Sequence, residues 1–346
     1  MITKAMATDL AVGVDIGGTK IAAGVVDSHG NMLSRARALI ASSEADPNVT
    51  TEQVAGLIRS AEEQAMGIGV RPDGMRRRAT LPVGIGIPAV LDSTRREVVW
   101  APNIPGFRGF GLVDALKGLL GREQIAMDFD GNAAVAGEAW IGAAAGKENV
   151  VFLIIGTGVG AGLILNGRLF RGASGMPGGV GWFALDPDAV CEALERRTPH
   201  FEAMCAGPGI VRIANTRARS GPGLGSSCKP ATPEYSDARQ LFSAYEAGDE
   251  HAACVLMQAA RYVGMGVANI VSTLNPDVVV IGGGVGLEYC RHDDLFKEIL
   301  NCVSGLAQPA AAAAVRVGPA ALGPAAGVVG AAKIALDTFC ATDERV

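Results

Sequence analysis

The sequence has little charge and no block of basic residues. Of its 346 residues 19% are charged and 49% are hydrophobic, and the formal net charge is −5. A negative net charge without a basic arm gives no general attraction to nucleic acid. No apolar run reaches membrane-spanning length, and the first residues lack the apolar core of a signal peptide. We therefore expect a cytoplasmic protein with neither nucleic acid nor a membrane as partner.

The sequence also lacks paired cysteines. Its seven cysteines are scattered without a Cys-x-x-Cys pair, and its four histidines show no metal-ligand spacing with them. In a cytosolic protein most of these thiols should be reduced and partly buried. Glycine, in contrast, is abundant at 47 residues. The length and this composition indicate about two α/β domains with many tight turns.

The first distinctive segment is a glycine turn between two apolar runs. Leu10–Val14 predicts a buried strand that leads into Asp15, and Ile21–Val26 predicts the return strand. The turn between them contains Gly17, Gly18, Thr19 and Lys20. Its N–H groups can form a nest for phosphate oxygens, and Asp15 could hold a hydrated Mg²⁺ beside it. A plain hairpin with an exposed lysine explains the same residues, so a second phosphate loop is needed to decide.

The second phosphate loop lies in the middle of the chain. An apolar strand is predicted at Val150–Ile155, and another at Leu163–Leu165. Between them lie Gly156, Thr157, Gly158, Gly160 and Gly162. The order of strand, glycine-threonine turn and strand has thus recurred. The recurrence predicts two related halves, each with one phosphate-binding hairpin.

The two loops together resemble those of the actin, heat-shock ATPase and hexokinase superfamily. Four further segments, in family order, make the chain similar to the ROK family on its glucokinase-like branch: Trp100–Gly106, Asp130–Glu138, Asn166–Gly172 and Val280–Val285. The resemblance implies two ribonuclease H-like α/β domains around a nucleotide and substrate cleft. We expect a small domain of residues 1–129 plus 331–346 and a large domain of residues 130–330.

The resemblance also implies roles in ATP-dependent phosphoryl transfer. Asp130, at the start of a predicted helix, would accept the proton of the acceptor hydroxyl, and an N-capping role is compatible with this. Asp15 would hold Mg²⁺ through water. The β- and γ-phosphates would contact Gly17, Gly18, Thr19, Gly156, Thr157 and Gly158. The adenosine side of the nucleotide would contact Gly282, Gly283 and Gly284. Lys20 is either a further phosphate contact or a lysine at the strand edge.

Three positions depart from the family pattern. Phe129 stands where an Asn usually precedes the catalytic Asp, and Gly179 where the family has a sugar-binding Glu. Trp182 replaces a His that both touches sugar and binds structural zinc. The cysteine-rich zinc loop is missing, and Cys191 and His200 cannot complete a tetrahedral site alone, so we expect no structural zinc. The remaining substrate-side positions of the family align with Asn103 and Glu202.

The departures bear on the acceptor. A pocket that has lost a Glu and a His cannot pair sugar hydroxyls there, which argues against glucose. We expect a small-molecule polyol, a C7-cyclitol or a modified sugar, phosphorylated on its primary hydroxyl by a homodimeric enzyme. A ROK glucokinase or hexokinase for glucose, fructose or an amino sugar stays an alternative, as does a non-catalytic sugar-binding or regulatory protein. Only fourteen residues precede Asp15, which does not fit the DNA-binding domain of the family's repressors. Polyphosphate stays open as the donor.

Overall fold

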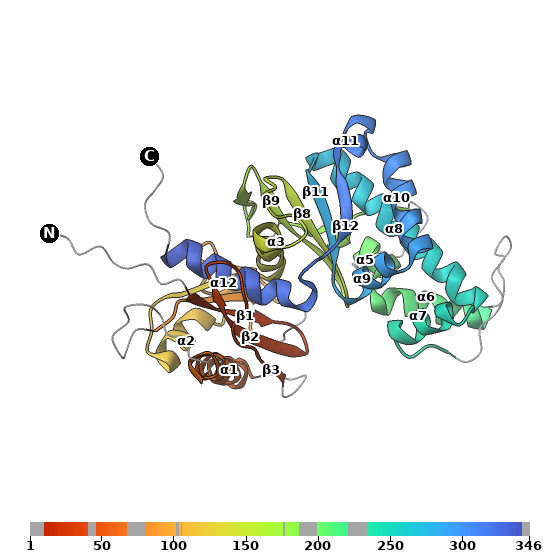
Figure 1. The fold of residues 1–346 in the computed structure, drawn as a ribbon. Coiled ribbons are helices and arrows are strands. Elements are labelled where there is room, and N and C mark those ends of the chain that lie inside the picture. Colours follow the sequence, from red (N-terminus) through yellow and green to blue (C-terminus); the bar gives the residue numbers. More distant parts are fainter. Residues whose placement is uncertain are drawn as a thin grey trace. The chain divides into compact units, whose positions relative to one another are not determined.

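The computed structural model describes residues 10–40, 46–67, 80–101, 104, 106–175, 177–186, 199–220 and 234–340. The chain divides into two compact units (Figure 1). The first unit contains Met1–Glu148, Gly162–Pro177 and Ala321–Val346, and the second contains Asn149–Ala161 and Gly178–Ala320. The expected border at Asp130 therefore falls inside the first unit, because the helix that begins there packs on the first sheet.

The first unit is built on a five-stranded sheet in the order β3-β2-β1-β4-β7. Its strands are β1 (Leu10–Ile16), β2 (Lys20–Asp27), β3 (Ala36–Leu39), β4 (Val83–Ile87) and β7 (Ile125–Phe129). The hairpin predicted around the first glycine turn is confirmed, since β1 and β2 pair antiparallel from Leu10↔Asp27 to Ile16↔Ile21. The strands β1, β4 and β7 run parallel, so their carboxyl ends meet at one edge.

Helices cover both faces of this sheet (Figure 1). On one face α1 (Pro47–Gly67) and α2 (Leu112–Leu120) bury large aliphatic side chains against Val12, Val14 and Ile16. On the other face lie α3 (Asp130–Ile141) and α12 (Ala326–Phe339). A small two-stranded sheet of β5 (Val90–Leu91) and β6 (Val98–Trp100), and the 3-10 turn η2 (Gly323–Ala325), complete the unit.

Glycine allows α3, α12 and the sheet to approach closely. A Cβ atom on Gly13 would lie 1.9 Å from the carbonyl oxygen of Val328, and one on Gly84 would lie 1.8 Å from that of Ala331. On α12 itself, a Cβ on Gly330 would lie 1.6 Å from the carbonyl oxygen of Ala133. The expectation that glycine serves mainly tight turns is therefore incomplete. Many glycines stand in regular elements where backbones touch.

A second sheet repeats this topology. It has the order β10-β9-β8-β11-β12, with β8 (Val150–Ile155), β9 (Val159–Leu165), β10 (Arg168–Leu169), β11 (Val278–Gly282) and β12 (Arg316–Pro319). All of β10 and the end of β9 belong to the first unit, and the rest of the sheet belongs to the second. In both sheets a three-stranded meander is extended by two parallel strands. The prediction of two related halves of ribonuclease H-like topology is thus confirmed. The border between the units passes through β9.

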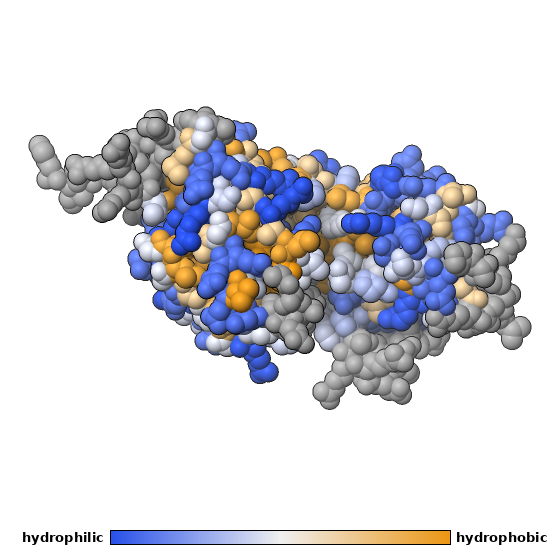
Figure 2. Space-filling model, turned by 90° about the horizontal axis from the view of Figure 1, so that it is seen from below, coloured by the Kyte–Doolittle hydropathy of each residue, from blue (hydrophilic) through white to orange (hydrophobic). Residues whose placement is uncertain are grey.

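Most described helices of the second unit pack on its longest one, α8 (Glu250–Leu274). The others are α5 (His200–Cys205), α6 (Gly207–Ser220), α7 (Ala238–Glu246), α9 (Gly284–Arg291), α10 (Asp293–Leu306) and α11 (Pro309–Ala314), with the 3-10 turn η1 (Val180–Trp182). By length and composition alone α8 could cross a membrane, which the sequence analysis did not anticipate. Its apolar window is 67% buried inside the protein, as in a core helix. On the face in Figure 2, apolar residues lie among hydrophilic ones.

Candidate active site

The turn after β1 places Asp15 against the start of α12. Asp15 shares a sheet face with Ala11 and Gly13, the face that α12 covers. A Cβ on Gly327 would lie 2.7 Å from Cγ of Asp15, so the helix can begin here only with glycine. Burial raises the pKa of Asp15, and the positive charge of Lys20 opposes this rise. Because burial disfavours the ionised form of Asp15, a cation bound beside its carboxylate would stabilise that form.

In both predicted phosphate loops the first glycine closes the turn. The Gly17 N–H donates to the Lys20 carbonyl at 2.9 Å, and the Gly156 N–H donates to the Gly158 carbonyl at 2.9 Å. These two N–H groups are therefore not available to a phosphate. Gly18, Thr19 and Lys20 are exposed, and the N–H groups of Gly18 and Thr19 make no hydrogen bond within the described ranges. The first loop thus offers fewer donors than the sequence suggested.

Asp130 lies at the carboxyl end of β7 as the first residue of α3. Its Oδ1 accepts the Gly131 N–H at 2.7 Å, while Phe129 occupies the N-cap position, so Asp130 does not cap the helix. Burial, and then the negative charge of Asp15, raise the pKa of Asp130 to about 7, although the Gly131 hydrogen bond lowers it. The first unit therefore brings together two carboxyl groups, one of them with the pKa of a general base.

A buried carboxylate that the sequence analysis missed holds the Asp130 turn. Asp128, only 2% exposed, accepts the Phe129 N–H at 2.9 Å and the Asn132 Nδ2 amide at 2.8 Å through Oδ1. Its Oδ2 accepts from Arg171 Nε at 2.8 Å and lies 2.7 Å from Arg171 Nη2. The available signal was the Asp-Phe-Asp pattern, together with an arginine inside a segment already matched to the family.

A cavity of about 410 Å³ opens beside this pair in the first unit. Val90, Leu91, Val99 and the ring of Phe129 give it an apolar wall. Its polar wall comes from Asp128 and Arg171, and from the residues around them: Asp92, Ser93, Arg95, Gly172, Ala173, Ser174 and Gly175. The predicted substrate residue Phe129 therefore does line a cavity next to the predicted base.

In the second unit, the predicted loop residue Gly158 lies against the predicted substrate residue Glu202. Glu202 Oε2 accepts the Val159 N–H at 2.9 Å. A Cβ on Gly158 would lie 2.7 Å from the same oxygen. Thr157, at the tip of the turn, is exposed. The structure thus brings these residues together, but it gives Glu202 a backbone partner that the sequence did not indicate.

The segment 178–182 has one glycine with space for a side chain. Gly178 has φ +77°, and a Cβ there would lie 1.8 Å from the Ala161 carbonyl oxygen. A Cβ on Gly181 would lie 2.5 Å from the Val159 carbonyl oxygen. At Gly179, which has φ −68°, the nearest atom is 3.9 Å away, in the Trp182 side chain. Trp182 is 55% exposed. The space at Gly179 and the exposed indole are therefore free to meet a ligand.

Packing accounts for two of the three glycines at the end of β11, Gly282 and Gly283. A Cβ on Gly282 would lie 2.3 Å from the Phe152 ring. Gly283 has φ +80°, and a Cβ there would lie 2.3 Å from the Ile155 carbonyl oxygen. Gly284, where α9 begins, is exposed and meets nothing within 4 Å. Only Gly284 therefore calls for an explanation by a ligand.

Two predicted positions lie outside the described residues: Asn103 and Cys191. His200 is 5% exposed, and its Nδ1 accepts the Leu185 N–H at 3.2 Å. Among the described cysteines, Cys205, Cys290 and Cys302 are free thiols, and Cys254 is disulfide-bonded. No ligand set that includes His200 lies within the ranges that the structure describes.

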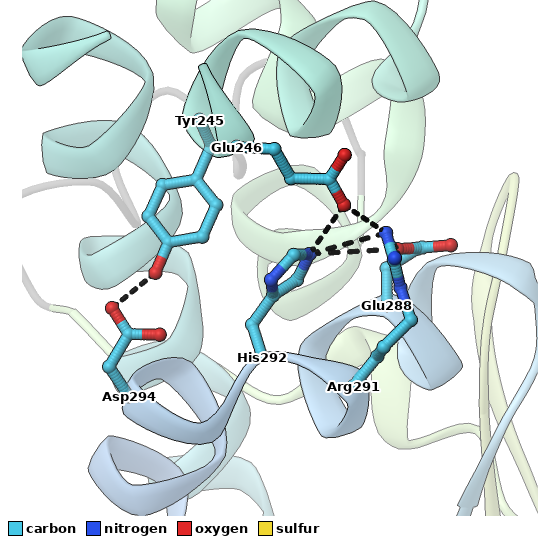
Figure 3. Close-up of polar contacts among 6 residues, drawn as sticks. All are labelled: Tyr245, Glu246, Glu288, Arg291, His292 and Asp294. Atoms are coloured by element: carbon cyan, nitrogen blue, oxygen red, sulfur yellow. Dashed lines mark hydrogen bonds and ion pairs between the residues drawn. The ribbon is translucent and has the colours of Figure 1, made fainter. Parts of the chain in front are cut away.

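One group in the second unit has the composition of a metal site: Glu246, Glu288 and His292. Figure 3 shows the Arg291 guanidinium between the two carboxylates, with Nη2 at 2.5 Å from Glu246 and 2.6 Å from Glu288. His292 Nε2 is 3.6 Å and 3.7 Å from them. The guanidinium already pairs with both carboxylates and offsets part of their charge. The group therefore joins α7 to α9 as an ion-pair network, which needs no metal.

Relatives of known activity are sugar kinases. A glucokinase of Streptomyces coelicolor is 32% identical over 333 residues, which are 94% of this chain and 97% of the relative. An N-acetyl-D-glucosamine kinase of Yersinia enterocolitica is 29% identical over 320 residues, 92% of this chain and 97% of the relative. The similarity therefore extends over both units, and these two relatives differ in their acceptor.

A solved structure shares both the fold and the sequence pattern. It is a ROK family glucokinase from Streptomyces griseus in complex with glucose and AMPPNP, 31% identical, with a TM-score of 0.71. The match covers 95% of this chain and 99% of that one. The sequence model of the ROK family matches residues 11–338. With both hairpins, the Asp130 turn and nearly the whole length matched, the chain belongs to the ROK family.

Proposed function

We propose that this protein transfers the γ-phosphate of ATP to the primary hydroxyl group of a sugar-like polyol, with a C7-cyclitol or a modified sugar as its preferred acceptor. The protein is a phosphotransferase with an alcohol group as acceptor, since its relatives of 29–32% identity over more than nine-tenths of the chain are sugar kinases. The proposal concerns the acceptor and the residues that act on it.

The observation that carries the proposal is the environment of Asp130. A general base works best when its pKa lies near the working pH, and burial together with Asp15 raises the pKa of Asp130 to about 7. Phosphoryl transfer needs a group that orients the acceptor hydroxyl and accepts its proton. Asp130 would do this, while Asp128 holds the turn on both sides of it through Phe129 and Asn132.

Both units contain groups suited to a nucleotide. ATP, when bound with Mg²⁺, supplies the phosphoryl group. In the first unit, the exposed N–H groups of Gly18 and Thr19 would meet phosphate oxygens, with Lys20 beside them, and Asp15 would hold Mg²⁺ through water. In the second unit, Thr157 at the exposed turn and Gly284 at the start of α9 would contact the donor.

The acceptor preference rests on Phe129, Gly179 and Trp182. Phe129 and Gly179 have no polar side-chain atom, and Trp182 offers only its indole N–H as a donor. A buried unpaired hydroxyl costs about 1–3 kcal/mol. Two such losses would lower kcat/KM for glucose by roughly two to four orders of magnitude. A carbocycle with fewer polar groups at that end would avoid part of this cost and could pack on the exposed Trp182 indole.

A side-by-side kinetic panel tests the proposal. Purified protein with ATP and Mg²⁺ should phosphorylate the best cyclitol or deoxygenated analogue with a kcat/KM far above that for glucose, N-acetylglucosamine or fructose. Asp130→Asn should lower kcat about a hundredfold or more without changing nucleotide affinity. Glucose as the best acceptor would refute the preference, and near-normal turnover by Asp130→Asn would refute the base.

A glucokinase is the second candidate. It is favoured by the relatives, because the solved Streptomyces griseus enzyme holds glucose and is similar over 95% of this chain. In the first unit, Asp128 and Arg171 would still offer polar groups to a polyol in the cavity beside Phe129. The same panel separates the two candidates, since a glucokinase would show its highest kcat/KM with glucose.

Two further expectations belong to the proposal. We expect a homodimer in the cytoplasm, and light scattering of the purified protein would measure the dimer directly. We also expect ATP as the donor, and replacing ATP by polyphosphate in the panel should abolish transfer.

A further inference from the structure

Glu202 contacts the backbone of the second phosphate loop. Its Oε2 accepts the N–H of Val159, the residue that directly follows the turn Gly156–Gly158, at 2.9 Å. The two residues are 43 positions apart in the sequence. Glu202 lies on the short helix α5, so this carboxylate ties α5 to the end of the loop.

The other end of the loop is tied to the same segment. The carbonyl oxygen of Gly156 accepts the Gly207 N–H at 2.9 Å. Residues 202–207 therefore hold the loop from both sides, by a side chain at one end and by the backbone at the other. The shape of the turn depends on this segment.

The glycines around Glu202 show how closely it is seated. A Cβ on Gly158 would lie 2.7 Å from Glu202 Oε2, and one on Gly181 would lie 3.4 Å from the Glu202 Cβ. Glycine at 158 is thus required by the position of Glu202, and not only by the approach of a phosphate. The carboxylate and the turn form one packed unit.

The second oxygen of Glu202 is available. Oε2 carries the hydrogen bond to Val159, and Oε1 has neither a hydrogen bond nor an ion pair in the part of the chain that the structure describes. An ionised carboxylate accepts through both oxygens. A hydroxyl of the acceptor could therefore bind Oε1 while Oε2 keeps the loop in place.

We propose that Glu202 is a positioning residue for the second phosphate loop, and that it connects acceptor binding to the geometry of that loop. This rests on the proposed function, in which Gly156–Gly158 contacts the β- and γ-phosphates. One side chain then serves both substrates. An acceptor bound to Oε1 fixes the Glu202 rotamer, and the fixed rotamer holds the Val159 N–H and the turn in the geometry that receives the donor.

The test measures nucleotide binding without any acceptor. Calorimetry with Mg²⁺ would compare AMPPNP and AMP, because AMP lacks the two phosphates that the loop contacts. Glu202→Ala should weaken AMPPNP about tenfold, since one charge-assisted hydrogen bond to the loop is lost, and should leave AMP unchanged. Glu202→Gln keeps an oxygen acceptor for the Val159 N–H and should bind AMPPNP nearly as the wild type does.

Matched variants separate positioning from general damage. Glu298→Ala removes a glutamate from α10 of the same unit and should leave both affinities unchanged. Gly158→Ala forces the 2.7 Å contact and should weaken AMPPNP. Gly158→Ala should weaken AMPPNP less when Glu202 is also replaced by Ala, because the Glu202 carboxylate is then no longer in the way of the new methyl group. Such non-additivity of the two substitutions indicates direct contact between the two residues.

The outcomes distinguish this inference from the proposed function. Wild-type affinity for AMPPNP in Glu202→Ala overturns the positioning role, and the kinase proposal stands if that affinity is well above the affinity for AMP. If the wild type binds AMPPNP no more tightly than AMP, the loop does not contact the phosphates, and both proposals fall. Selective loss of AMPPNP binding in Glu202→Ala, restored in Glu202→Gln, supports the positioning role, and the coupling is supported if the acceptor then tightens AMPPNP in the wild type and not in Glu202→Ala.

Discussion

Arg171 holds Asp128 through two nitrogens of its guanidinium, with Nε and Nη2 at 2.8 and 2.7 Å from the same carboxylate oxygen. The Asp128 side chain is 3% exposed and that of Arg171 is 34% exposed. The other oxygen of Asp128 binds Phe129 and Asn132, on either side of Asp130. Arg171 therefore supports the turn that carries the proposed base, from 43 residues away in the sequence.

Removing the guanidinium should lower both stability and turnover. Arg171→Met leaves the Asp128 carboxylate buried without its cation. Loss of one partner of a buried pair costs about 3–5 kcal/mol, and the partial exposure of Arg171 reduces this to about 1–3 kcal/mol. We expect a lower urea midpoint and a kcat reduced about tenfold or more, with a nearly normal KM for ATP. Arg171→Lys keeps the charge but loses the forked guanidinium. Its urea midpoint and kcat should therefore lie between those of the wild type and those of Arg171→Met.

The control for this prediction is the exposed pair Arg96–Asp114, whose side chains are 50% and 57% exposed. Arg96→Met should leave the urea midpoint and kcat unchanged, because exposed ion pairs contribute little. Equal effects of Arg171→Met and Arg96→Met would contradict the supporting role of Arg171.

Activity should rise with pH through the neutral range. Asp130 can accept a proton only as a carboxylate, and its pKa is about 7, so kcat/KM should increase as pH passes 7. The negative charge of Asp15 raises the pKa of Asp130, and Asp15→Asn removes this charge. The acid limb of the residual activity should therefore move to lower pH. A limb that stays in place in Asp15→Asn would exclude electrostatic coupling between the two carboxyl groups.

The same pKa gives a prediction for stability. The pKa of Asp130 in the folded protein lies above its ordinary value of 3.8, so protonated Asp130 favours the folded state. This contribution to the free energy of unfolding is fully present below about pH 4 and is lost as the pH rises through 7. Asp130→Asn should therefore be more stable than the wild type at pH 8, and the difference should shrink towards pH 4. Urea unfolding at both pH values measures this, and a difference that grows on acidification would have the wrong sign.

Acceptor preference should respond to Gly179. Because the nearest atom to a Cβ there is 3.9 Å away and φ is −68°, Gly179→Glu should fold normally and return a carboxylate to this position. We expect kcat/KM for glucose to rise about tenfold or more relative to a cyclitol, and further with Trp182→His added. Gly178→Ala is the matched control, since its φ of +77° and a 1.8 Å contact should destabilise the protein without changing the preference.

Purified protein should contain no stoichiometric zinc. The Nδ1 atom of His200 already accepts the Leu185 N–H, and Cys191 and His200 supply two ligands where a structural site needs four. Elemental analysis of protein prepared without added zinc, and thermal unfolding with and without a chelator, would measure this. One tightly bound zinc per chain, or unfolding by the chelator, would contradict the prediction.

Local patterns in the sequence determined most of the elements that carry the site. The strand predicted at Val150–Ile155 has the same first and last residues as β8. The predicted helix Leu112–Leu120 stops before Gly121, which adopts φ +62°. Strands and helix ends follow from side-chain periodicity and from the backbone freedom of glycine, which are properties of a few adjacent residues. The two hairpins and the repeat of the topology were predictable for this reason.

Contacts between distant segments were decided only by the tertiary structure. Nothing near Glu202 in the sequence indicates Val159 as its partner, and nothing near Asp128 indicates Arg171. Glu138, fully buried, likewise accepts the Leu322 N–H at 2.8 Å across 184 positions. A side chain's polar partner and the space around a glycine depend on which backbones the packed core brings together. Residue types therefore indicated the chemistry that we propose for this protein. Packing decided the raised pKa of the proposed base Asp130, the bond from Glu202 to the second loop and the burial of Glu138 in the fold.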